Sequence, residues 1–126
     1  MAQGSGSAER ALVLGVVLVF LVFNCEVAES VVYTVGDGGG WTFGTSGWPA
    51  GKTFRAGDVL VFKYNPAVHN VVSVPAGGYK SCTASPGSRV FKSGDDRITL
   101  SRGTNYFICS VPGHCQGGLK IAVTAA

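Results

Sequence analysis

Two histidines and one cysteine form the most informative chemical pattern in this sequence. His69 and His114 are the only histidines of the chain, and His114 follows Cys109 by five residues. Two imidazoles and one thiolate are the ligands of a trigonal copper site of the blue-copper type. Such a ligand set serves Cu(II) and Cu(I) in nearly one geometry, so little has to move when an electron arrives. The pattern therefore predicts a copper site suited to one-electron transfer.

The position that would complete this site holds a residue that cannot coordinate a metal. Blue-copper sites commonly have a weak axial ligand, methionine or glutamine, a few residues beyond the second histidine. Leu119 stands at that place here, and the only methionine of the chain is Met1. We therefore expect three protein ligands, with Leu119 as a non-ligand at the axial position.

Zinc and a metal-free fold are the alternatives to copper. Two histidines and one cysteine with an open fourth position also suit Zn²⁺. A catalytic zinc site would need a general base nearby, whereas no Asp or Glu occurs between Arg97 and the C-terminus. We therefore favour copper over zinc and over a metal-free structural domain, and we expect that the chain is not an enzyme.

The local sequence indicates how the three side chains come together. Pro112-Gly113 suits the centre of a type II turn, because proline presets the first position and glycine supplies the positive φ of the second. That turn would bring His114 back beside Cys109. His69 would come from a separate part of the sheet, and Asn70 after it is a natural hydrogen-bond donor for holding the ligand loop.

The cysteines bear on the copper hypothesis, because one of them must stay outside any disulfide. Beyond the first thirty residues, which include Cys25, the chain has Cys82, Cys109 and Cys115. In an oxidising compartment two of these three are expected to pair. The histidine spacing favours a bridge between Cys82 and Cys115. A bridge from Cys109 to either of the others would exclude the copper site, and the cysteine count alone leaves it open.

Short apolar or alternating runs, separated by glycine, proline, asparagine and aspartate, dominate the chain after residue 30. Such runs are typical of strands bounded by turns. We expect strands at residues 31–35, 59–64, 70–74, 89–92, 97–100, 105–109 and 119–123. A short helical turn is expected at residues 75–81 or around residues 85–87. Regularly spaced short strands indicate an all-β antiparallel sandwich or barrel.

The aromatic side chains are expected to fill the core and cover the ends of the sheets, with no role at a cofactor. They are Trp41, Phe43, Trp48, Phe54, Tyr64 and Tyr106.

Residues 1–30 have the features of a secretory signal peptide. Residues 11–23 form an unbroken apolar run, which is shorter than the roughly 20 residues that a membrane-spanning helix needs. Small residues at Ala28 and Ser30 predict cleavage after Ser30. An uncleaved membrane anchor is the alternative. With cleavage, we expect residues 31–126 to form one secreted domain without a membrane anchor.

Residues 31–126 are basic, with nine Lys or Arg against four Asp or Glu, a formal charge of +5. The basic residues are scattered along the chain and form no basic cluster. Their scatter and the expected secretion argue against nucleic acid as a partner. We expect an acidic redox partner or an anionic matrix instead, and a monomeric protein.

Residues 31–126 resemble the phytocyanins, the plant branch of the cupredoxins, and are most similar to the plantacyanin (basic blue protein) subgroup. The resemblance covers the whole expected domain and rests on motifs that are specific in combination. These are YTVGD and GGW within residues 33–41, FRAGD at 54–58 before VLVF, YNP at 64–66 before HNVV at 69–72, YFIC at 106–109, PGHC at 112–115 and KIAV at 120–123.

The resemblance implies a Greek-key β-sandwich of two sheets with one type 1 copper ion near one end. It implies His69, Cys109 and His114 as the copper ligands, and a disulfide between Cys82 and Cys115 beside them.

The resemblance further implies that His114 has a solvent-exposed edge through which electrons pass, and that Asn70 hydrogen-bonds near the thiolate. The family pattern is Cys-x₄-His-x₄-Met, with Gln in the stellacyanin branch, and here it ends in Leu119. Gln116 lies too early for that role by pattern, and the sequence leaves open whether Gln116 or a water approaches the copper.

Two functions from different classes are consistent with these observations. The first is a secreted one-electron carrier of the extracellular space or cell wall. The alternative is an extracellular signalling or cell-wall interaction protein in which copper redox activity is secondary, as in phytocyanin relatives that have lost the ligands. The presence of all three ligand residues favours the first function.

Overall fold

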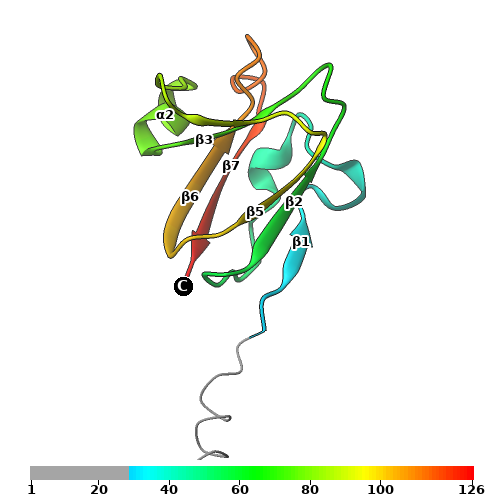
Figure 1. Ribbon diagram of the computed structural model, residues 1–126, viewed down its shortest axis with the longest axis vertical. Helices are drawn as coiled ribbons and strands as arrows, with labels where there is room; N and C mark the ends of the chain where they lie inside the picture. The colour runs from blue at the N-terminus through cyan, green and yellow to red at the C-terminus, as the bar shows by residue number, and fades with distance from the viewer. Residues whose placement is uncertain (1–28) are drawn as a thin grey trace, which may run out of the picture.

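Seven strands in two sheets form the framework of the computed structural model, which describes residues 29–126 (Figure 1). The elements, in chain order, are β1 (Val32–Thr34), η1 (Asp37–Gly39), η2 (Thr45–Gly47), β2 (Val59–Lys63), β3 (Val71–Val74), α2 (Ala76–Ser81), β4 (Arg89–Phe91), β5 (Asp95–Thr99), β6 (Gly103–Ile108) and β7 (Lys120–Ala125). The signal-peptide interpretation of residues 1–30 lies almost entirely outside the described residues and stays a prediction.

The sheets have the strand orders β1-β2-β5 and β4-β3-β6-β7. The expectation of purely antiparallel pairing is wrong at one place, because β1 pairs with β2 in parallel, with Val32 opposite Val59. Parallel neighbours need a long connection, and the segment that contains η1 and η2 supplies it. The pairs β2–β5, β3–β4, β3–β6 and β6–β7 are antiparallel.

The strand bounds differ from the expected ones by at most two residues, and one of the two-residue differences is instructive. Strand β5 begins at Asp95 and not at residue 97. Aspartate is a poor strand former, but Asp96 is buried and its carboxylate accepts hydrogen bonds from Tyr64 and Ser93. These partners compensate for the low strand propensity.

The core lies between the two sheets. Strand β7 alternates, with Ile121, Val123 and Ala125 buried and the residues between them more exposed. The same core contains Phe62 of β2 and Phe107 of β6, whose rings meet edge to face with centroids 5.2 Å apart. This packing joins the sheets and holds the strand ends in fixed positions.

Helix α2 forms at the first of the two segments for which a helical turn was expected. It follows Pro75 and ends at Cys82, whose φ of 55° is left-handed. The second candidate, residues 85–87, forms a turn and no helix. Among the residues that the model describes, no helix is both long and apolar enough to cross a membrane.

The expectation for the aromatic residues is wrong for Phe43. Trp41 and Phe54 are buried in the core, and the other aromatic residues named above, apart from Phe43, are half-buried. Phe43 is 51% exposed. It lies in an irregular segment between buried Trp41 and buried Thr45, and its backbone keeps it out of the core.

Two connections meet at one end of the sandwich. Figure 1 shows the β6–β7 loop (orange) and the β2–β3 connection (green) at the top, whereas the start of β1 and the C-terminus lie at the other end. His69 belongs to the β2–β3 connection, and Cys109 and His114 belong to the β6–β7 loop. The topology therefore brings the expected metal ligands, which come from distant segments of the chain, to the same end of the sandwich.

Candidate metal centre

The side chains of His69, Cys109 and His114 converge. The Nδ1 atoms of the two imidazoles are 2.9 Å apart, and Cys109 Sγ lies 3.5 Å from His114 Nδ1 and 3.9 Å from His69 Nδ1. Cys109 and His69 are each at least nine-tenths buried, whereas His114 is half-buried. We call these three side chains the donor cluster.

The dimensions of the donor cluster fit a metal ion. The point equidistant from the three donor atoms lies about 2.0 Å from each of them, close to the metal–nitrogen length of about 2.0–2.1 Å and somewhat below the metal–sulfur length of about 2.3 Å seen with zinc. One soft thiolate with two imidazoles is also the donor set that copper accepts in both oxidation states.

The loop between β6 and β7 holds Cys109 and His114 in position. The His114 amide donates to the Val111 carbonyl at 3.0 Å, and Gly113 between them has a φ of 83°, as a type II turn requires. The Cys109 amide donates to the Leu119 carbonyl, and the Leu119 amide donates to the His114 carbonyl, each at 3.1 Å. The loop is therefore closed by backbone bonds at both ends.

His69 approaches from the β2–β3 connection. Its amide donates to the Asn65 carbonyl at 3.0 Å. Burial, with a smaller contribution from the nearby His114, lowers the pKa of His69 below its usual value. Both effects disfavour the imidazolium form, so the metal-free site favours the neutral imidazole that can bind a metal.

Asn70 ties the two connections together. Its side-chain oxygen accepts a hydrogen bond from the Ser110 amide, and its side-chain nitrogen donates to Ser110 Oγ, both at 2.8 Å. Its own carbonyl accepts a hydrogen bond from Trp41 Nε1 at 2.9 Å. Because Ser110 follows Cys109 directly, these bonds brace the segment that carries the thiol.

The predicted disulfide between Cys82 and Cys115 is confirmed. Their Cα atoms are 5.6 Å apart, and the bond joins the end of α2 to the residue that follows His114. Within the described residues Cys109 is the free cysteine, and it is buried. The alternative pairings that would have consumed Cys109 are therefore not formed.

Leu119 lies in the same buried cluster as Cys109 and has no exposed surface. Gln116, in contrast, is exposed. Leu119 is thus a fully buried apolar residue of the core that contains Cys109, and its carbonyl accepts the hydrogen bond from the Cys109 amide.

Phe43 is the neighbour of the donor cluster that sequence reasoning missed. Its ring centroid lies 5.0 Å from that of His114 and 5.7 Å from that of His69, in edge-to-face arrangements. No sequence motif predicts this contact, because it joins segments that only the tertiary structure brings together.

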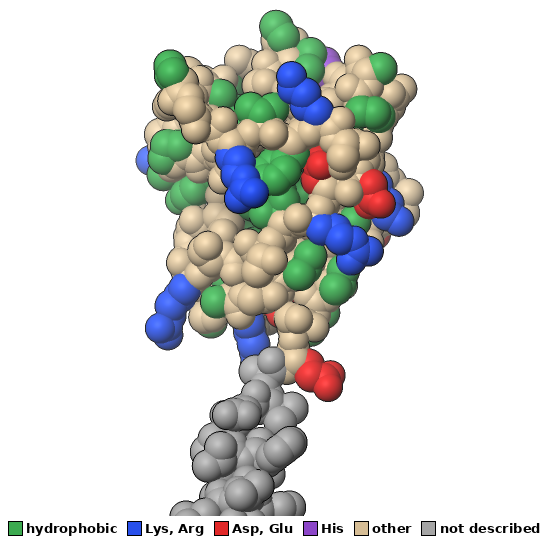
Figure 2. All heavy atoms as spheres, in the orientation of Figure 1, with side chains coloured by type: hydrophobic (Ala, Val, Ile, Leu, Met, Phe, Trp, Pro, Cys, Tyr) green, Lys and Arg blue, Asp and Glu red, His purple; other side chains and the backbone are tan. Residues whose placement is uncertain are grey.

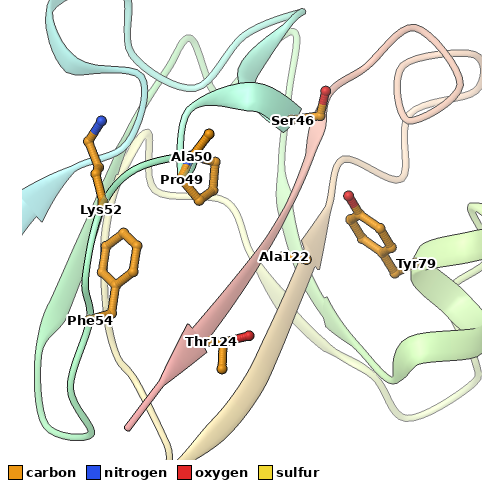
Figure 3. Close-up of a pocket in the computed structure, with 8 residues that line it drawn as sticks. All are labelled: Ser46, Pro49, Ala50, Lys52, Phe54, Tyr79, Ala122 and Thr124. Atoms are coloured by element: carbon orange, nitrogen blue, oxygen red, sulfur yellow. The ribbon is translucent and has the colours of Figure 1, made fainter.

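A separate groove lies on the outer side of β7 and has a volume of about 340 Å³ (Figure 3). It is lined by Ser46, Pro49, Ala50, Lys52, Phe54, Tyr79, Ala122 and Thr124. No member of the donor cluster lines this groove. The donor cluster and this groove are therefore separate features of the sandwich.

Comparisons with known proteins agree with this geometry. The family model described as plastocyanin-like domain matches residues 41–119. A basic blue protein of Arabidopsis thaliana is 52% identical over 128 residues, which cover 99% of each chain. The chain belongs to the phytocyanin family. The resemblance of its sequence to phytocyanins is thereby confirmed, including the similarity to the basic blue protein subgroup.

Solved phytocyanin structures share the fold. Cucumber basic protein, a blue copper protein, matches with a TM-score of 0.75 and 57% identity, covering 76% of this chain and all of its own. Spinach plantacyanin matches with a TM-score of 0.69 and 57% identity over the same shares. The predicted all-β cupredoxin sandwich of two sheets is confirmed.

Proposed function

We propose that this phytocyanin binds one copper ion through His69, Cys109 and His114 and works as a secreted one-electron carrier. The observation that carries the proposal is the convergence of two imidazole nitrogens and one buried thiol around a common point. The relatives named as blue copper proteins support the choice of copper over zinc.

The protein's contribution is a rigid, partly dry ligand frame. When bound, copper supplies a one-electron couple between Cu(II) and Cu(I). The backbone bonds that close the loop between Cys109 and Leu119 limit its movement, and Asn70 braces the segment at Ser110. A frame that already holds its donors in place keeps the rearrangement between the two oxidation states small.

Leu119 leaves the copper with three protein ligands in this proposal. Its complete burial and its place in the cluster with Cys109 support a dry axial wall, and the exposure of Gln116 argues against that side chain as a substitute. Loss of an axial donor destabilises Cu(II) more than Cu(I). The reduction potential is therefore higher than with an axial methionine.

Electrons enter through His114, which is the more exposed of the two histidines. The disulfide between Cys82 and Cys115 supports an oxidising compartment, as does the signal-peptide pattern of residues 1–30. The partner is acidic or part of an anionic matrix, and the carrier is monomeric.

The first test is the visible and EPR spectrum of the oxidised protein titrated with Cu(II), beside a Cys109→Ser variant. We expect an intense thiolate-to-copper band with narrow copper hyperfine splitting, bleached by ascorbate and missing in the variant. A colourless protein, or an ordinary Cu(II) signal of equal strength in both, would overturn the copper proposal. Tight binding of Zn²⁺ without a copper spectrum would favour zinc.

A second candidate, an extracellular interaction protein, is favoured by the distribution of charge. Of the four acidic residues after residue 30, Asp58 and Asp96 are buried, so the surface is more basic than the composition indicates. The Cys109→Ser variant separates the two functions. If it retained the full biological effect of the protein, copper chemistry would be secondary.

A further inference from the structure

Phe43 is placed unusually for a large apolar side chain. Half of its surface is exposed, yet its ring contacts the rings of both His69 and His114 edge to face. Single exposed apolar residues are common and need no explanation. This one contacts both imidazoles of the donor cluster, in which Cys109 is itself only 1% exposed.

The segment around Phe43 is anchored on both sides. The Trp41 amide donates to the Lys63 carbonyl at 2.8 Å, and the Trp41 indole donates to the carbonyl of Asn70, the residue after His69. On the other side, buried Thr45 donates through its hydroxyl to the Thr42 carbonyl at 2.9 Å. The exposed ring is therefore held by a fixed backbone.

The ligand loop is shaped to receive the ring. A Cβ atom added to Gly117 would lie 3.1 Å from two ring carbons of Phe43, which is closer than ordinary van der Waals contact. Gly117 follows His114 by three residues, in the loop whose amide hydrogen bonds return to Gly113 and His114. The absence of a side chain at Gly117 thus lets Phe43 lie against the loop.

We propose that Phe43 is a positioning residue of the metal centre, whose ring shields one side of the donor cluster and holds both imidazoles in place, while part of His114 stays exposed. The proposal rests on the proposed function where copper is concerned. Its consequence for the metal-free protein does not depend on copper binding. Without the ring, small molecules reach the Cys109 thiol more easily.

The test compares the rate of Cys109 alkylation by iodoacetamide in metal-free, folded protein, with Cys25→Ser in every variant so that Cys109 is the thiol measured. We expect Phe43→Ala to accelerate alkylation about tenfold, the order of magnitude that two aromatic edge contacts are worth. Phe43→Tyr, which keeps the ring, should restore the slow rate. Val90→Ala, which trims an exposed apolar side chain of β4, should leave it unchanged.

Gly117→Ala supplies a second, independent variant. Its added methyl group would push the Phe43 ring by a few tenths of an ångström, so alkylation should accelerate, by less than in Phe43→Ala, in an otherwise unchanged chain. In a Phe43→Ala background the same substitution should have no further effect, since the two act through one contact. Additive effects, or a Phe43→Ala rate equal to the wild-type rate, would overturn the proposal.

Copper-loaded protein gives the second readout. Phe43→Ala should release copper to a chelator about tenfold faster and should bind azide with a change in the visible spectrum, whereas Phe43→Tyr and Val90→Ala should behave as wild type. If the wild-type protein forms no blue copper site, the proposed function fails, while the alkylation rates still decide whether Phe43 shields the thiol. If copper release and azide binding are unchanged in Phe43→Ala, the ring has no role at the metal, and this result would contradict the proposal.

Discussion

At the scale of single residues, the site combines one half-buried ligand residue with buried ones. His114 is half-buried, whereas Cys109 and Leu119 are almost completely removed from solvent. Burial keeps water away from the thiolate and lets its surroundings control the potential. Under the proposed function, the partly exposed His114 is the edge through which an electron would pass without opening the site.

Substitution of Leu119 tests the axial position. Leu119→Met adds a soft donor and should lower the midpoint potential by about 60 mV or more, which is a tenfold preference for Cu(II) in a one-electron couple. Leu119→Gln should lower it further, because an oxygen donor favours Cu(II) more strongly. The measurement is protein-film or mediated voltammetry.

The matched control is Leu60→Met, the same change in buried β2, which should leave the potential unaltered. A potential that is unchanged or raised in both Leu119 variants would show that this side chain does not face the copper.

At the scale of elements, a polar contact joins three strands beside the core. The Tyr64 hydroxyl, just after β2, donates to the buried carboxylate of Asp96 in β5 and lies 3.1 Å from the carbonyl of Phe91 in β4. Strand β5 belongs to one sheet and β4 to the other. This contact therefore links the two sheets close to the end of β2, from which the chain continues to His69.

The pH dependence of stability reports on that link. Burial, with the hydrogen bond to Asp96, raises the pKa of Tyr64 from 10.0 to about 12. Between these pH values the unfolded chain loses the phenolic proton and the folded chain keeps it, so the free energy of unfolding should fall as pH rises. Below pH 10 the contribution is fully present.

Tyr64→Phe should remove this part of the alkaline loss and lower stability at neutral pH by about 1.5–3 kcal/mol, the range for a hydrogen bond to a charged group. Urea unfolding at a series of pH values measures both effects. Tyr33→Phe is the control, since the Tyr33 hydroxyl bonds only to the Thr53 carbonyl near the surface, and it should cost less. An alkaline loss that persists unchanged in Tyr64→Phe would contradict the assignment.

At the scale of the whole molecule, the domain of residues 31–126 is basic, and the face drawn in Figure 2 shows no concentrated basic patch. Figure 2 shows Lys and Arg side chains spread over the visible face between uncharged ones, with few acidic groups. The formal charge of residues 31–126 is +5. A diffuse charge of this kind attracts acidic partners at a distance and does not specify one docking orientation.

The charge predicts how salt affects electron exchange with small redox complexes. The rate with an anionic complex should fall severalfold as the Debye length shrinks from about 30 Å at 0.01 M salt to about 10 Å at 0.1 M. The rate with a cationic complex, the matched control, should rise over the same range. Stopped-flow absorbance at the blue band measures both, and the opposite trends would refute the expectation of an acidic partner.

Much of the fold could be predicted, because its signals are local. Alternating apolar residues and glycine or proline turns mark each strand, and the type II turn at Pro112-Gly113 follows from two adjacent residues. The parallel pairing of β1 with β2 could not be predicted in the same way. Pairing direction depends on how the long connection through η1 and η2 crosses the sandwich, which no local pattern encodes.

The sequence by itself determined the donor types and the leucine at the position where the family pattern has a fourth ligand, since these depend on residue identity and spacing. The free thiol of Cys109 was decided by the structure, because the cysteine count left the disulfide pairing open. Only the tertiary structure decided that β5 begins at Asp95 and that Phe43 covers the imidazoles and not the core. In both cases the deciding contacts join distant segments, Asp96 with Tyr64 and Phe43 with His114. Such contacts override local propensity, because a buried carboxylate needs a partner and an anchored backbone directs its side chain.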